Sequence, residues 1–147
     1  MERLLEASEN GDEGVVVQLL SEGAHINATD EYGLTPLMWA ASSGHERVVG
    51  LLLENRADIE ARSCYGTALH NAAEGGYQGV VSLLLEGGAD FNAEDEEGLT
   101  PLQVAVRKQR RLMRLPLMQS WTTQYEAVVE LLQSYSETFG KQGMETC

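Results

Sequence analysis

A recurring phrase divides the chain into units of nearly equal length. Its leading leucine stands at Leu37, Leu69 and Leu102, so successive copies are 32 and 33 residues apart. An earlier copy has lost its start, but Leu4 still opens it. Repeats of about 20 to 50 residues are typical of stacked architectures. The chain is therefore predicted to form a stack of small units, each stabilised by its neighbours.

The second half of each unit recurs as well. Paired valines follow the leading leucine by 11 residues in the first three units, as Val15–Val16, Val48–Val49 and Val80–Val81. A run of leucines comes next, and each unit then closes with a phrase similar to Gly-Ala-Asp-x-Asn-Ala. The valine and leucine segment is apolar on more than one side, so we expect a helix enclosed by neighbours.

The first half of a unit predicts a short, capped helix. Thr35 is suited to the N-cap position, and Pro36 fits the first helical position because its missing N–H needs no partner there. Leu37 is followed by small alanines on the same helical face. Gly44 supplies the positive φ that ends a short helix. Each unit is therefore predicted to be two helices, followed by a projecting turn.

This pattern resembles the ankyrin repeat family, whose unit of 33 residues carries Thr-Pro-Leu-His-x-Ala. The resemblance implies an all-α solenoid with projecting turn or hairpin tips. The expected repeats and the polar C-terminal tail are 1–29, 30–62, 63–94, 95–135 and 136–147. In the family, a histidine at the position of His70 ties neighbouring turns by hydrogen bonds.

The chain departs from the family pattern at several places, two of which bear most on the fold. Arg56 stands where glycine usually ends the second helix, so we expect local strain there. In the last repeat, Gln109 replaces the expected glycine, and the paired valines appear 15 residues late. The insertion therefore lies between Lys108 and Tyr125.

Residues 107–114 of this last repeat carry five of the ten lysines and arginines of the chain. Three interpretations remain open. In the first, the segment extends the preceding helix, with Val104, Leu112 and Leu115 on one face and Pro116 at its end. In the second, it is a disordered loop, as insertions in repeats often are. In the third, it is a functional patch that resembles a nuclear import signal or a peptide docking site.

Charge and composition exclude several classes of function. The net charge is −13, and residues 1–106 hold 4 basic and 19 acidic side chains, a net −15. Such a body repels phosphate backbones and disfavours general nucleic-acid binding. No apolar run is long enough to cross a membrane. The two cysteines make no disulfide framework, and they favour a reducing compartment.

No catalytic constellation or metal-binding spacing is present, so we predict a non-enzymatic protein without cofactor or metal. We expect a monomer in the cytoplasm, the nucleus or both, which binds another protein as an adaptor or regulatory scaffold.

The resemblance places the binding surface on the concave side, over the turn tips and the exposed side of each first helix. Tyr32 and Tyr65 are large where the fold does not require it, and aromatic side chains are enriched at binding hot spots. Trp39 either binds a partner or packs under a neighbouring turn. The candidate residues are Glu31, Tyr32, Leu34, Trp39, Ser42, Ser43, Cys64, Tyr65, Asn71, Glu74, Glu96, Glu97, Arg107 and Lys108.

Two asparagines in the closing phrases carry a further hypothesis. Ankyrin asparagines at this position are substrates of an asparaginyl hydroxylase that favours a leucine eight residues earlier. Asn27 follows Leu19, and Asn92 follows Leu84, at that spacing. Possible hydroxylation is therefore one alternative function, and a nucleic-acid or nuclear-targeting role of residues 107–114 is another.

Overall fold

The computed structural model describes residues 2–140. Within this range the chain forms eight α-helices and one short 3-10 helix, joined by turns. Their bounds are α1 (Glu2–Asn10), α2 (Glu13–Ser21), α3 (Pro36–Ser43), α4 (Glu46–Glu54), α5 (Ala68–Gly75), α6 (Gln78–Glu86), α7 (Pro101–Met113), η1 (Pro116–Trp121) and α8 (Thr122–Gly140). The expected all-α architecture is confirmed.

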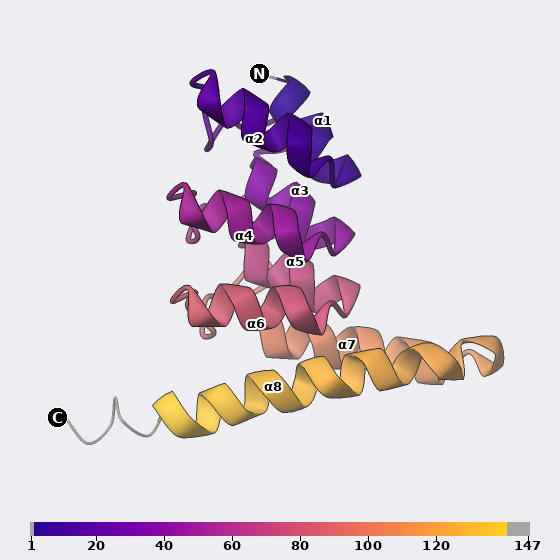
Figure 1. The fold of residues 1–147 in the computed structure, drawn as a ribbon. Coiled ribbons are helices and arrows are strands. Elements are labelled where there is room, and N and C mark those ends of the chain that lie inside the picture. Colours follow the sequence, from indigo (N-terminus) through magenta and orange to yellow (C-terminus); the bar gives the residue numbers. More distant parts are fainter. Residues whose placement is uncertain (1, 141–147) are drawn as a thin grey trace, which may run out of the picture.

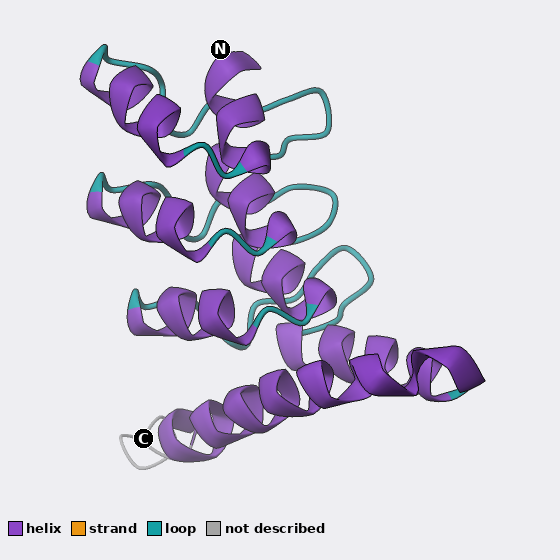
Figure 2. Ribbon diagram, turned by 45° about the vertical axis from the view of Figure 1, so that its right-hand side comes forward, coloured by secondary structure: helices purple, strands orange, loops and turns teal. Residues whose placement is uncertain are grey.

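The helices are stacked in two layers (Figure 1). The first helices of the repeats, α1, α3, α5 and α7, pack in order against one another, and α2, α4, α6 and α8 form the second layer. Figure 2 shows the long connections between repeats looping out on one side of the stack. Each repeat therefore contacts only its neighbours, as in a solenoid.

The first helices begin and end as their sequence predicts. The Thr35 hydroxyl accepts a hydrogen bond from the backbone N–H of Met38 at 3.3 Å, and Pro36 occupies the first turn. Gly44 follows α3 with a φ of 76°. The equivalent glycines also allow close packing, because rings of the next repeat lie against them. A Cβ on Gly44 would come within 2.6 Å of the Tyr77 ring.

The core runs the length of the stack as a ladder of equivalent positions. Val48 and Val80 are 1% and 0% exposed, and Leu52 and Leu84 are both 0% exposed. Burying a side chain of this size contributes about 1.5–3 kcal/mol. The small Ala40 and its equivalents in later repeats let the first helices approach closely.

The 15-residue insertion leaves this ladder in register. Tyr125, Val128 and Leu132 repeat the spacing of Tyr77, Val80 and Leu84, and Val128 and Leu132 are again fully buried. The Tyr125 ring packs on the helix-ending Gly76, as Tyr77 packs on Gly44. The insertion is thus accommodated between the two helices of the last repeat.

The inserted residues form a helical hairpin that projects sideways from the last repeat, past the ends of the helices above it (Figure 1). The interpretation as an extended helix is confirmed, because α7 continues to Met113; the disordered loop is wrong. One detail of the prediction is also wrong. Leu115 lies outside α7 and is exposed, so it does not share the buried face of Val104. Pro116 begins η1 after the helix has ended.

Two further expectations can be compared with the structure. Arg56 has a φ of 64°, the left-handed conformation that glycine adopts at the equivalent Gly23 and Gly88. The expected strain at Arg56 is therefore present. The polar tail was expected to begin at residue 136, but α8 continues to Gly140 and Phe139 packs near Tyr135. Residues 141–147 lie outside the described range.

Candidate functional site

Aspartates at the starts of two turns shape the projecting tips. Asp30 Oδ1 accepts hydrogen bonds from the backbone N–H groups of Tyr32 and Leu34, both at 2.9 Å. Asp95 makes the same pair of bonds in the last repeat. In the third repeat the tip is one residue shorter, and Ser63 takes the place of the aspartate. These bonds hold the exposed tip side chains in defined positions.

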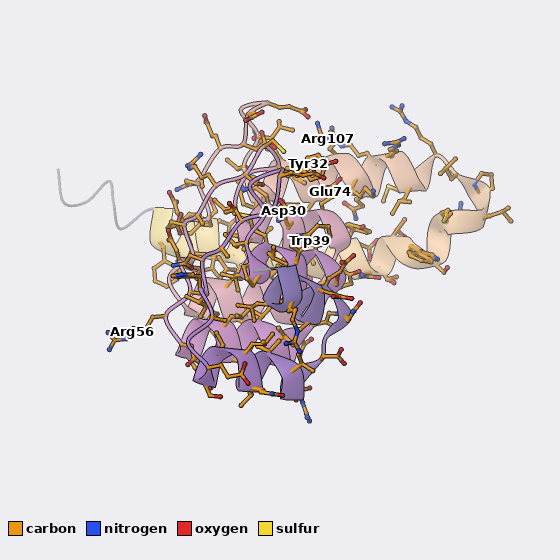
Figure 3. All side chains as sticks on the ribbon, turned by 90° about the horizontal axis from the view of Figure 1, so that it is seen from above. Asp30, Tyr32, Trp39, Arg56, Glu74 and Arg107 are labelled. Atoms are coloured by element: carbon orange, nitrogen blue, oxygen red, sulfur yellow. The ribbon has the colours of Figure 1, made fainter. Side chains whose placement is uncertain are left out.

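Two tyrosines stand at equivalent places on neighbouring tips. Tyr32 is 57% exposed and Tyr65 is 55% exposed. The tips are in contact, since the Cys64 thiol lies 3.6 Å from the carbonyl oxygen of Tyr32. Figure 3 shows Tyr32 on the same side of the stack as Glu74 and Arg107, whereas Arg56 points away from it. The tyrosines therefore present apolar rings to the solvent on the predicted concave face.

Trp39 behaves differently from the tyrosines. Its side chain is half-buried against the core, and its Nε1–H donates to Asp30 Oδ2 at 2.9 Å. Of the two interpretations for Trp39, the structure supports packing beneath the turn. The ring joins α3 to the tip that carries Tyr32.

A small hollow of about 210 Å³ lies between the third and fourth repeats. It brings together five predicted residues, from two turn tips, α5 and α7: Cys64, Tyr65, Glu74, Glu97 and Arg107. An adjoining hollow of about 240 Å³ adds Lys108. The hollow is built by two adjacent repeats alone.

Sequence reasoning left four residues around these hollows out of the predicted binding surface. His70, Asp95 and Val104 line the first, and Arg111 lines the second. Asp95 stands at the same place in its turn as Asp30 and accepts the same pair of hydrogen bonds. Val104 was expected to share one face of its helix with Leu112 and Leu115, and it is 5% exposed. The one signal in the sequence was the repeat pattern itself, which places these residues at fixed offsets from the leading leucines and the turns.

The hollow has mixed charge. Arg107 forms an ion pair with Glu97, with a guanidinium nitrogen 2.5 Å from the carboxylate. Both side chains remain more than half exposed, so water screens the pair. The hydrogen bond to Glu97 raises the pKa of Arg107 above its ordinary value, and the charges of Asp95 and Glu74 act in the same direction. Glu74 is left as an exposed carboxylate without an ion pair among the described residues.

The remaining predicted residues are placed in three ways. Leu34 and Asn71 are buried, at 8% and 7% exposure, so their assignment to an exposed binding surface is wrong. Leu34 is part of the hydrophobic core cluster. Ser43 is half-buried. The exposed members outside the hollows are Glu31, Ser42 and Glu96.

Histidines connect the repeats, as the resemblance implied for His70. His70 Nε2 lies 2.8 Å from the Leu99 carbonyl oxygen, and its Nδ1 faces Thr67. His45 reaches the Glu9 carbonyl oxygen at 2.8 Å. Across residues 2–140 no group of three metal-ligating side chains comes together, and no helix is long and apolar enough to cross a membrane.

The two candidate hydroxylation sites are both exposed, but they differ in their contacts. Asn27 Oδ1 accepts a hydrogen bond from the backbone N–H of Asp58 at 2.9 Å, so it connects two closing phrases. Between the next two closing phrases, Glu60 stands in place of the asparagine, and its Oε1 accepts a hydrogen bond from the backbone N–H of Asp90. The Asn92 backbone N–H donates to Asp90. Hydroxylation of either asparagine stays a prediction.

Taken together, the stacked helix pairs, projecting tips and inter-repeat histidines define a helical repeat solenoid of the kind that binds proteins. A family model described as ankyrin repeats (3 copies) matches residues 4–95 and 62–142. The chain belongs to the ankyrin repeat family.

Similar proteins carry this family in their names. A putative ankyrin repeat protein of fowlpox virus is 40% identical over 107 residues, which is 70% of this chain and 31% of that protein. An E3 ubiquitin-protein ligase of Arabidopsis thaliana, XBAT33, is 40% identical over 74 residues, 48% of this chain and 14% of the ligase. The human ankyrin repeat family A protein 2 is 64% identical over 33 residues, 22% of this chain and 10% of that protein. The chain thus matches less than a third of each relative.

Proposed function

We propose that this chain is a non-enzymatic adaptor or regulatory scaffold whose concave face binds a partner protein. Ankyrin repeats are generally protein–protein interaction modules, and a rigid stack loses little conformational entropy on binding. The observation that carries the proposal is the pair Tyr32 and Tyr65. Both rings are more than half exposed on adjacent, hydrogen-bonded tips, where packing gives no reason for an aromatic side chain.

The surroundings of the tyrosines suggest the chemistry of the partner. Glu31, Glu74, Glu96 and Glu97 are exposed on the tips of the second and fourth repeats and on α5, and Arg107 is the basic residue paired with one of them. Rings inserted into a partner supply most of the apolar contact, and the carboxylates favour a basic segment beside it. We therefore expect a partner surface with apolar pockets and nearby lysines or arginines.

The test is a comparison of three baits for capture of proteins from lysate, followed by titration of each purified partner. The first bait is the chain itself, the second carries Tyr32→Ala and Tyr65→Ala, and the third carries Val15→Ala and Val17→Ala. The two valines are exposed on α2, in the other layer of the stack, so the third bait is a matched control. Circular dichroism first establishes that all three are folded.

We expect a partner that binds the first and third baits and loses at least about tenfold in affinity for the second, as hot-spot aromatics do. Trp39 is left unchanged, because its replacement would also disturb the tip that presents Tyr32. Equal affinity for all three baits would contradict the proposed site. The hypothesis of hydroxylation is tested separately, by mass spectrometry of Asn27 and Asn92.

A further inference from the structure

The outer face of α7 is a stacking surface that no described helix covers. In the second and third repeats, Leu37 and Leu69 are each 1% exposed because the next repeat packs on them. The equivalent Leu102 is only half-buried. Four residues further on, the equivalent of the fully buried Ala73 is Val106, which is also half-buried. The last repeat thus keeps the apolar positions to which a further helix would pack.

These residues form one side of an open groove of about 770 Å³. Leu99, Leu102 and Val106 provide its apolar lining, and Gln133 of α8 lies at its edge. Leu99 is the equivalent of Leu34, which is 8% exposed where a following repeat is present. The groove is therefore the position that a fifth repeat would occupy in a longer stack.

Four arginines line the same groove: Arg107, Arg110, Arg111 and Arg114. Their spacing places them on one side of α7 and its C-terminal end. Arg107 pairs with Glu97, but within residues 2–140 no carboxylate lies at ion-pair distance from the other three guanidinium groups. Like charges this close repel one another unless an anion lies between them.

We propose that this groove binds an acidic amphipathic helix of a partner protein, laid along α7 where the next repeat would lie. The apolar lining requires leucine-like residues at i, i+3 and i+4 of the ligand helix, as in other helix-in-groove complexes. The arginines require glutamates or aspartates along one edge of that helix. Guanidinium groups are well suited to this task, because each can donate two parallel hydrogen bonds to a carboxylate.

The observations favour a protein ligand over other polyanions. A nucleic acid offers no aliphatic stripe for Leu102 and Val106. A nucleic acid or an anionic membrane that extended over the body of the stack would be repelled there, because residues 1–106 hold 4 basic and 19 acidic side chains. A single acidic helix contacts only the basic end. The exposed Leu117 and Trp121 at the tip of the hairpin leave anionic vesicles as a necessary arm of the test.

The experiment measures fluorescence anisotropy of a labelled synthetic helix, about five turns long, with leucines on one face and glutamates beside them. Two matched peptides replace the glutamates by lysine or the leucines by serine. The protein is used as the full chain, and as the variant Arg110→Gln/Arg111→Gln/Arg114→Gln. The control variant Arg3→Gln/Arg47→Gln/Arg62→Gln makes the same change in net charge elsewhere.

We expect binding of the acidic, leucine-bearing helix that weakens at least about tenfold in the groove variant, stays within about twofold in the control and falls with added salt. The lysine peptide and the serine peptide should bind at least about tenfold more weakly. The variant Tyr32→Ala/Tyr65→Ala should bind the peptide normally, which separates this site from the concave face.

Several results would overturn the proposal. Absence of peptide binding, or equal binding by both arginine variants, would mean that the arginines only keep the end of the stack soluble. Equal binding of the serine peptide would mean that the groove does not accept an apolar stripe. Tighter binding of vesicles containing phosphatidylserine, or of a single-stranded oligonucleotide, through the same arginines would assign the site to a membrane or a nucleic acid.

Discussion

The indole Nε1–H of Trp39 donates a hydrogen bond of 2.9 Å to the Oδ2 atom of Asp30, nine residues earlier. The other oxygen of the same carboxylate accepts the backbone N–H groups of Tyr32 and Leu34. One aspartate therefore couples the first helix of the repeat to the tip that presents Tyr32. The position of Tyr32, a proposed binding residue, depends in this way on the half-buried Trp39.

Trp39→Phe tests this coupling, because phenylalanine keeps an aromatic ring and removes the donor. Hydrogen bonds to charged groups contribute about 1.5–3 kcal/mol, and partial exposure reduces this figure, so we expect a loss of about 1 kcal/mol. Urea unfolding followed by circular dichroism measures it. Tyr32→Phe is the control and should change stability by less than about 0.5 kcal/mol. A stability equal to that of the unaltered chain would show that the bond contributes nothing.

Arg56→Gly should stabilise the protein. Arg56 has a φ of 64°, and a side chain in the left-handed region costs roughly 1–2 kcal/mol, part of which is offset by the greater entropy of glycine in the unfolded chain. We expect a gain of about 0.5–1 kcal/mol. The reverse change, Gly88→Ala, places a Cβ in open space at a φ of 93° and should destabilise through backbone conformation alone. A loss of stability on Arg56→Gly would refute the assignment of strain.

Asn71→Val is expected to be neutral or stabilising by about 1 kcal/mol, although the side chain is buried. Asn71 occupies the position of Trp39 and Val104, and its buried Nδ2 has no hydrogen-bond partner among residues 2–140. Ser63 stands where Asp30 would supply a carboxylate, and its hydroxyl is already engaged with its own turn. Thermal unfolding measures the change. A loss above about 1 kcal/mol would indicate that the amide makes a bond essential to the fold.

Tyr125→Phe should alter the dependence of stability on pH. Burial raises the pKa of Tyr125, and the charges of Tyr77 and Glu74 act in the same direction. Above about pH 10 the unfolded chain loses this proton while the native state keeps it, so stability falls as the pH rises through the native pKa. The variant should lose part of this alkaline decline.

At neutral pH the same variant loses the hydrogen bond of 2.7 Å from the Tyr125 hydroxyl to the Glu74 carbonyl oxygen, and about 1 kcal/mol with it. Urea unfolding at neutral pH and near pH 10.5 measures both effects. Tyr65→Phe is the matched control, since that ring is exposed. Identical alkaline declines in the two variants would contradict the role of Tyr125.

Much of the site was accessible from periodicity, and the failures have a common cause. The exposed Tyr32, Tyr65 and Glu74 were placed by their offsets from the leading leucines. Leu34 and Asn71 share such offsets, yet they are buried. Their burial depends on how the helices and tips pack together, which no local spacing describes.

The sequence by itself determined the unit, its two helices, the number of units and the place of the insertion. These follow from local chemistry: the N-caps Thr35 and Thr100, the glycines that end helices, and an apolar spacing that returns at Val128. Only the tertiary structure decided what the inserted residues do. A helix propensity does not state whether the chain ends, loops or doubles back.

Contact with the preceding repeat settles that question, because the Tyr125 ring packs on Gly76 and brings α8 back into the ladder. The same return leaves Leu102 and Val106 without a following repeat, beside a row of arginines. Which surfaces of this stack are covered and which are open is a property of packing between repeats. Burial depends on contacts between segments that are distant in sequence, so local sequence patterns alone do not determine it.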